Sequence, residues 1–197
     1  QMHVTYFFNG GVEKPHVGED FFIIPSQRVE SYASVPEMSS PIIRDEVVRR
    51  VRAYDVYNYK FILINIANHD MLGHTGNYEA TVRGNEIVDS LTADISKAVL
   101  SMGGAIVITA DHGNCETMIN RVTKEVDIAH TNNPVPLIIL SSMDDIIPKP
   151  GTHLIKVGTG PRAQATGLLA DVAPTCLGLL GLDAPESMTG VDLRNII

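Results

Sequence analysis

Two spacings of apolar residues alternate along this chain, one typical of buried strands and one typical of helices. Short apolar runs occupy residues 62–66, 105–109 and 135–140, and such runs predict strands that are buried on both faces. Between the first two runs, residues 78–101 repeat apolar positions at intervals of three or four, which predicts one long helix. This alternation predicts an α/β fold with a largely parallel sheet flanked by helices.

Weaker signals of the same kinds flank this central region. Residues 4–8 form a short apolar run before a glycine turn and predict a further strand. Pro41 begins a predicted helix that continues to about Tyr54, since proline is favoured in the first turn. Residues 121–126 predict a short hairpin, and Asp171 is the predicted N-cap of a last helix.

Acidic and histidine side chains lie beside each of the three central strands. Asp70 and His74 follow the first strand, Asp111 and His112 follow the second after one intervening residue, and His130 lies a few residues before the third. Because open α/β proteins bind ligands at the carboxyl ends of their strands, we expect these groups to converge at one sheet edge. Imidazole and carboxylate ligands without a thiolate suit manganese, zinc or a similar divalent ion better than calcium.

The spacing within these segments indicates which residues can share an ion. Asp70 and His74 are four residues apart, so on a helical turn they project from one face, and His130 would complete a three-ligand set. Asp111 and His112 are adjacent and can both bind only from an irregular turn, which the following glycine permits. Each motif alone also fits an ordinary helix surface or an Asx turn, and it is their co-occurrence that favours a metal site.

The remaining histidines and the two cysteines have simpler explanations. His69 is adjacent to Asp70 but points about 100° away from it on a helix, so we exclude it from the direct ligands. Three histidines without such neighbours are expected at the surface or in structural hydrogen bonds: His3, His16 and His153. Two cysteines without a C-x-x-C spacing imply neither a disulfide framework nor a thiolate metal site.

Composition narrows the class of protein. The 197 residues, 44% of them hydrophobic, are enough for one domain with one substantial core. The net charge of −8 argues against binding to the phosphate backbone of a nucleic acid. No apolar run approaches the ~20 residues of a membrane span, and the first residues do not form a secretory leader. A cytoplasmic protein that acts on a small molecule is therefore expected.

Six segments that together span almost the whole chain carry a resemblance to a known family. They are HVTYFFNGGVEKPHVGEDFFIIPS, SYASVPEMSS, NHDMLGHTGNYEATV, ITADHGNCE, AHTNNPVPLI and GLLADVAPTCLGLLGLDAPESMTGVDL. These segments resemble the C-terminal part of the phosphatase-like domain of cofactor-independent phosphoglycerate mutases, in the alkaline phosphatase superfamily. The Asp-His-Gly-Asn motif is shared across that superfamily, whereas Pro-Glu-Met-Ser and Asn-Gly-Gly indicate the mutase branch.

The resemblance implies a glycolytic isomerase that interconverts 3-phosphoglycerate and 2-phosphoglycerate through a phosphoserine. It also implies two Mn²⁺ ions, or Mg²⁺ or Co²⁺ in some members. By the same resemblance Asp70, His74 and His130 are ligands of the first ion, which holds substrate oxygens. Asp111 and His112 are ligands of the second ion, which activates the serine. Two neighbouring ions can stabilise both the attacking and the leaving oxygen of a phosphoryl transfer.

Members of this family are well over twice as long as the chain. The resemblance places the serine nucleophile, a further aspartate ligand and an inserted arginine-rich domain in segments that are absent here. No catalytic nucleophile is therefore expected within residues 1–197, which should form an incomplete domain, inactive alone and prone to self-association through exposed apolar surface. Two alternatives remain open: a noncatalytic metal-binding module, and a related phosphatase or phosphopentomutase.

Overall fold

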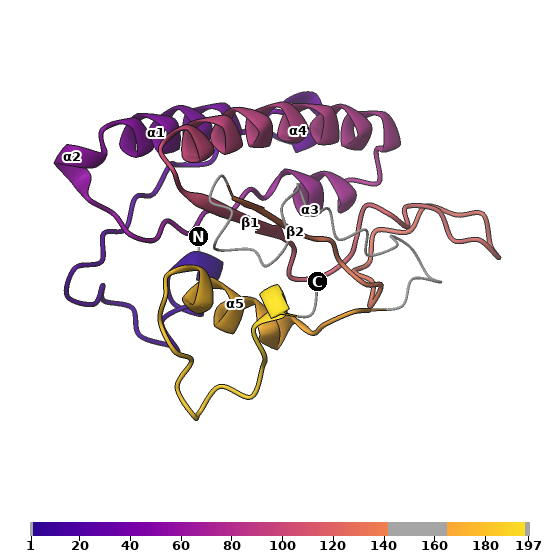
Figure 1. Ribbon diagram of the computed structural model, residues 1–197. Coiled ribbons are helices and arrows are strands. Elements are labelled where there is room, and N and C mark those ends of the chain that lie inside the picture. Colours follow the sequence, from indigo (N-terminus) through magenta and orange to yellow (C-terminus); the bar gives the residue numbers. More distant parts are fainter. Residues whose placement is uncertain (1, 142–164, 196–197) are drawn as a thin grey trace. The chain divides into compact units, whose positions relative to one another are not determined.

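The computed structural model describes residues 2–141 and 165–195, drawn as the coloured ribbon in Figure 1. The chain forms two compact units, Gln1–Thr92 and Ala93–Ile197. The long helix α4 (Tyr78–Ser101) begins in the first unit and ends in the second. It has the bounds that its apolar periodicity predicts, and that prediction is confirmed.

Short helices and extended segments make up the rest of the first unit. Helix α1 (Ser40–Arg52) carries proline in its first turn and confirms the helix predicted from Pro41. It is followed by α2 (Tyr54–Tyr57), which ends at Asn58 in the left-handed conformation, with φ 51°. Helix α3 (Asn68–Gly73) is a turn and a half long; it carries the predicted metal ligand Asp70, and the predicted ligand His74 is its C-cap residue. Two 3-10 turns complete the unit: η1 (Met2–Val4) and η2 (Tyr32–Ser34).

Buried contacts at the start of α3 fix the position of that helix. The Asn68 side-chain amide donates hydrogen bonds to the carbonyl oxygens of Pro36, at 2.7 Å, and of Glu37, at 3.0 Å. Leu72 is fully buried, and Gly84 of α4 leaves room for it, because a Cβ at position 84 would overlap the Leu72 side chain. A short helix that is anchored on both sides can present its outer face with a defined orientation.

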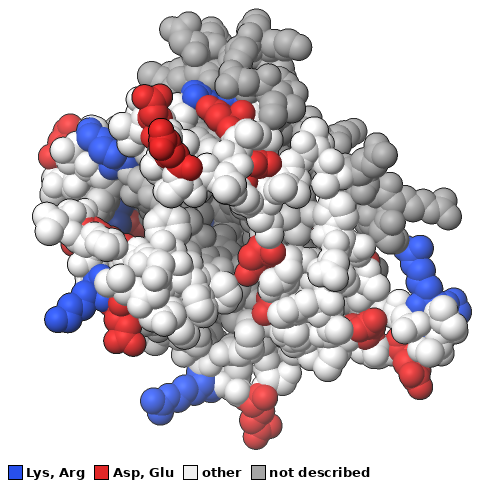
Figure 2. Space-filling view, turned by 90° about the horizontal axis from the view of Figure 1, so that it is seen from below, with Lys and Arg blue, Asp and Glu red and all other residues white. Residues whose placement is uncertain are grey.

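Charged side chains of both signs lie on the one face of the molecule that Figure 2 draws. On the face drawn in Figure 2, acidic and basic side chains are interspersed among uncharged ones. This face is not the single basic face typical of nucleic-acid binding, and the chain as a whole has a net charge of −8. Among the helices in the described residues, none is long and apolar enough to cross a membrane.

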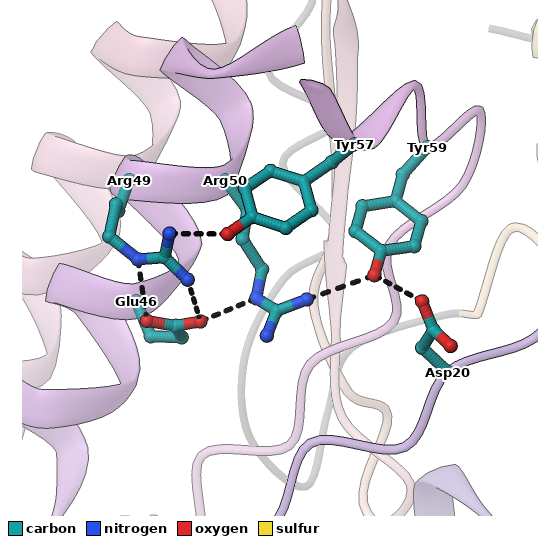
Figure 3. Close-up of polar contacts among 6 residues, drawn as sticks. All are labelled: Asp20, Glu46, Arg49, Arg50, Tyr57 and Tyr59. Atoms are coloured by element: carbon teal, nitrogen blue, oxygen red, sulfur yellow. Dashed lines mark hydrogen bonds and ion pairs between the residues drawn. The ribbon is translucent and has the colours of Figure 1, made fainter.

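A cluster of polar and aromatic side chains links Asp20 and Tyr59 to helix α1 (Figure 3). Glu46 accepts hydrogen bonds from the guanidinium groups of Arg49 and Arg50, and these bonds, opposed by partial burial, lower its pKa to about 2. Arg50 also lies 4.6 Å from the centre of the Phe22 ring, a cation–π contact. The six residues drawn are Asp20, Glu46, Arg49, Arg50, Tyr57 and Tyr59.

The second unit contains the one sheet found in the described residues. Strand β1 (Ala105–Thr109) pairs with β2 (Leu137–Ser141), so that Val107 lies opposite Ile139. Helix α5 (Val172–Leu179) follows the 3-10 turn η3 (Leu169–Asp171), and η4 (Leu193–Asn195) comes last. The predicted hairpin is confirmed by the antiparallel bridge between Ile119 and Val126.

This sheet differs from the prediction of a largely parallel one, because β1 and β2 are antiparallel and no parallel pair is present in the described ranges. Residues 62–66 are not a strand, and residues 4–8 form local turns in which Phe7 N donates to Met2 O at 3.0 Å. The predicted burial of residues 62–66 is also not found, since Ile62 is 37% and Leu63 40% exposed. The physical reason is that an apolar run does not provide the neighbour that a strand needs for its backbone N–H and C=O groups. The predictions of strands at residues 62–66 and 4–8 are therefore wrong.

Asp171 precedes α5 as predicted, but its side chain does not cap that helix. Its carboxylate instead accepts hydrogen bonds from the backbone amides of Leu168, at 2.7 Å, and Val191, at 2.8 Å. These two bonds outweigh the effect of burial and lower the pKa of the Asp171 carboxyl. The prediction that a helix begins after Asp171 is confirmed. The prediction that the Asp171 side chain caps this helix is wrong.

We expect Asp171→Asn to lower the free energy of unfolding by about 1–3 kcal/mol at pH 7. The asparagine side chain has only one acceptor oxygen, so it can replace only one of the two hydrogen bonds that the carboxylate accepts. Since the folded-state pKa lies below the unfolded one, the carboxylate stabilises the fold fully above the unfolded pKa of about 3.9. This stabilisation is lost as the pH falls through the folded pKa, so the two proteins should converge in acid. Urea unfolding at several pH values measures the difference, with the exposed Asp183→Asn as matched control. A pH-independent difference would contradict the assignment.

Candidate metal centre

The first part of the candidate site is a carboxylate and an imidazole on one turn of α3. Nε2 of His74 lies 3.2 Å from Oδ1 of Asp70, and both side chains are somewhat more than a third exposed. His74 keeps helical backbone angles at the end of α3, and its N–H donates to the carbonyl oxygen of Asp70. The pair thus projects from one helical face, as its spacing predicts, and both groups are open to an ion from solvent.

The second part follows β1 in the other unit. Asp111 and His112 lie on an irregular bend, with Nε2 of His112 3.6 Å from Oδ1 of Asp111. The ring of His112 stacks on that of His130, with 3.8 Å between the ring centres and 21° between the planes. This unit by itself therefore brings together three of the five predicted ligands. The assignment of His130 to an ion with Asp70 and His74 combines residues of both units and stays a prediction.

Gly113 is needed at this bend for a reason that differs from the one predicted. It forms an antiparallel bridge with Thr131, whose N–H donates to the Gly113 carbonyl oxygen at 2.8 Å. A Cβ at position 113 would lie 2.5 Å from Oε1 of Glu116 and would also overlap Thr131. Glycine therefore permits close approach of two segments here, and its φ is not in the left-handed region.

Glu116 belongs to this region although the sequence analysis did not select it. Its carboxylate accepts hydrogen bonds from the side chains of Thr131 and Asn133 and from the backbone amide of Asn114. Burial raises the pKa of this carboxyl, but the hydrogen bonds outweigh burial and lower it overall. The only sequence signal was a carboxylate four residues after a predicted histidine ligand.

The other histidines occupy different environments. His69 is hydrogen-bonded to Asn85, and burial lowers the pKa of its imidazole more than this bond raises it. His3 and His16 are exposed, the former in a tilted ring contact with Phe7. His153 lies outside the described residues.

The two cysteines are Cys115 and Cys176, and neither is joined in a disulfide in the described residues. Burial raises the pKa of Cys176, which favours the unreactive protonated form.

The donor set suits a divalent metal. Each of Asp70, His74 and His130 offers a single ligand atom, either a carboxylate oxygen or an imidazole nitrogen. Asp111 and His112 add one donor of each kind, and no thiolate belongs to the set. Such donors fit manganese, zinc and related ions.

Comparison with known proteins shows the class to which this chain belongs. The family described as the Metalloenzyme superfamily matches residues 2–184, and the chain belongs to that superfamily. This membership supports an alkaline-phosphatase-like metalloenzyme fold, in agreement with the α/β class predicted from the sequence.

The most similar relatives narrow the class further. The chain is 44% identical to the 2,3-bisphosphoglycerate-independent phosphoglycerate mutase of Thermomicrobium roseum over 97% of its own length. It is 43% identical to the enzyme of that name from Clostridium tetani over 99% of its length. In both cases it spans 34% of the relative, so the chain corresponds to about a third of these proteins.

A solved structure agrees with this result. The chain superposes on phosphoglycerate mutase from Leishmania mexicana, solved at low cobalt concentration, with a TM-score of 0.77 and 33% identity. The match covers 97% of this chain and 35% of that one. The resemblance inferred from the six sequence segments is thereby confirmed.

Proposed function

We propose that residues 1–197 are the C-terminal, metal-binding portion of the phosphatase-like domain of a phosphoglycerate mutase. The complete enzyme would interconvert 3-phosphoglycerate and 2-phosphoglycerate in glycolysis, in the cytoplasm. The observation that carries this proposal is that relatives of this name match 97–99% of the chain at 42–44% identity. The superfamily match alone would also suit a phosphatase or phosphopentomutase, and the shared name of the relatives favours the mutase.

We assign the ligands as the sequence analysis expected. Asp70, His74 and His130 bind one ion and hold it towards substrate oxygens, whereas Asp111 and His112 bind the other. The exposure of the Asp70–His74 pair and the grouping of Asp111 with His112 after β1 support these roles. Mn²⁺ is the proposed ion, with Mg²⁺ or Co²⁺ as substitutes; when bound, such ions supply charge stabilisation for phosphoryl transfer.

The chain's own residues perform the binding part of the reaction. Neutral imidazole nitrogens and ionised carboxylates donate electron pairs to an ion, so these five side chains fix where charge on a phosphoryl group is stabilised. The nucleophilic serine is proposed to lie in the two thirds of the relatives that this chain does not span.

Titration with Mn²⁺ alone tests the metal assignment on the chain as it exists. We expect about one equivalent to bind at pH 8, because Asp70, His74 and His130 need nothing from another segment, and binding to weaken in acid as protons compete for the imidazole nitrogens. His130→Ala should abolish the calorimetric heat, whereas the exposed His16→Ala should not change it. Absence of heat for the unmodified chain would count against the proposed site.

A further inference from the structure

Glu116 connects the two segments of the second unit that carry candidate ligands. His112 lies immediately before Gly113, and His130 immediately before Thr131, and these two following residues form the backbone bridge. We propose that Glu116 is a positioning residue that holds the Asp111–His112 bend in register with His130 before any ion binds. The consequence for metal affinity rests on the proposed function; the consequence for ring geometry does not.

The two oxygens of Glu116 serve different segments. Oε1 accepts hydrogen bonds from the Thr131 hydroxyl and from Nδ2 of Asn133, the latter at 2.8 Å, both after His130 in the chain. Oε2 accepts from the backbone N–H of Asn114, at 2.8 Å, on the side of His112. A carboxylate can accept at both oxygens, and these charge-assisted bonds are stronger than neutral ones. One side chain therefore clamps both segments at once.

Backbone geometry makes this clamp short and direct. The Thr131 N–H donates to the Gly113 carbonyl oxygen at 2.8 Å, and Gly113 itself has no side chain that could separate the two segments. Asn114, whose backbone N–H donates to Glu116, is only 6% exposed. The Glu116 carboxylate therefore bonds to residues on both sides of the bridge. The two bridge residues, Gly113 and Thr131, each directly follow one of the two histidines.

The positions of the imidazoles follow from this register. The rings of His112 and His130 are stacked at 3.8 Å between centres. A shift of one residue at the bridge would move His130 by about 3.3 Å along the strand direction, enough to destroy the stack. Catalytic and metal-binding groups tolerate only about 0.5 Å of displacement, so a fixed register is needed before an ion can be held.

The test combines ring geometry without metal and affinity for Mn²⁺. In the metal-free protein, nuclear Overhauser contacts between the ring protons of His112 and His130 should be present in the unmodified chain and lost in Glu116→Ala. Titration with Mn²⁺ should show affinity reduced by about 10- to 100-fold in this variant, as for other groups that orient metal ligands. Glu125→Ala, which removes an exposed carboxylate from the intervening hairpin, is the matched control and should leave both measurements unchanged.

Glu116→Gln keeps the test decisive if the alanine variant does not fold. It preserves the side-chain size but presents an NH₂ group to one of the donors, so we expect weakened ring contacts and an intermediate loss of affinity of about 10-fold. Intact ring contacts in a folded Glu116→Ala, or in Glu116→Gln if the alanine variant is unfolded, would overturn the proposal. If the unmodified chain binds no Mn²⁺, the proposed function fails, and the ring contacts still decide the role of Glu116.

Discussion

His130→Ala is expected to lower the mutase turnover of the complete enzyme by about three orders of magnitude or more. The substitution removes one of three proposed ligands, so it reduces both metal content and the accuracy with which substrate oxygens are held. Asp111→Ala and His112→Ala should be equally harmful, because they remove the proposed ion that activates the serine, so that phosphoenzyme does not form. Steady-state rates, together with metal analysis of each purified variant, measure these effects.

The matched control for this series is His16→Ala, an exposed histidine that is expected to leave rate and metal content unchanged. His69→Ala should fall between these extremes, with a loss of about 10- to 100-fold, because His69 precedes Asp70 in the chain and its imidazole is partly buried and hydrogen-bonded to Asn85. A His130→Ala enzyme with unaltered rate and metal stoichiometry would show that the ligand assignment is wrong.

The second large effect concerns the chain by itself. Residues 1–197 are expected to show no conversion of 3-phosphoglycerate even when saturated with Mn²⁺, because the proposed serine nucleophile lies in the part of the relatives that the chain does not span. The full-length Clostridium tetani relative, assayed under the same conditions, provides the positive control. Turnover that copurifies with the chain through several independent steps would contradict this expectation.

The same argument predicts the solution behaviour of the chain. Large apolar side chains such as Phe7, at 61% exposure, and Phe8, at 53%, lie open in the first unit. Exposed apolar surface favours association, so sedimentation should show self-association that increases with concentration. A strictly monomeric profile would count against this part of the proposal and leave the absence of turnover unaffected.

Local sequence signals determined the helices and the chemistry of the candidate site. The periodicity of α4 fixed its extent, the proline of α1 marked its start, and the four-residue spacing of Asp70 and His74 placed both on one face of α3. These features depend on residues close together in the chain, since helical hydrogen bonds join residues only four apart. The ligand types likewise depend only on which residues stand in the chain.

Only the tertiary structure decided which distant segments pair. An apolar run such as residues 62–66 does not specify a partner strand, and the pairing of β1 with β2 is antiparallel. The stacking of His112 on His130 and the bonds from Glu116 to Thr131 join residues 15 or more positions apart. Such contacts depend on the summed packing of many residues, so no local pattern in the sequence encodes them.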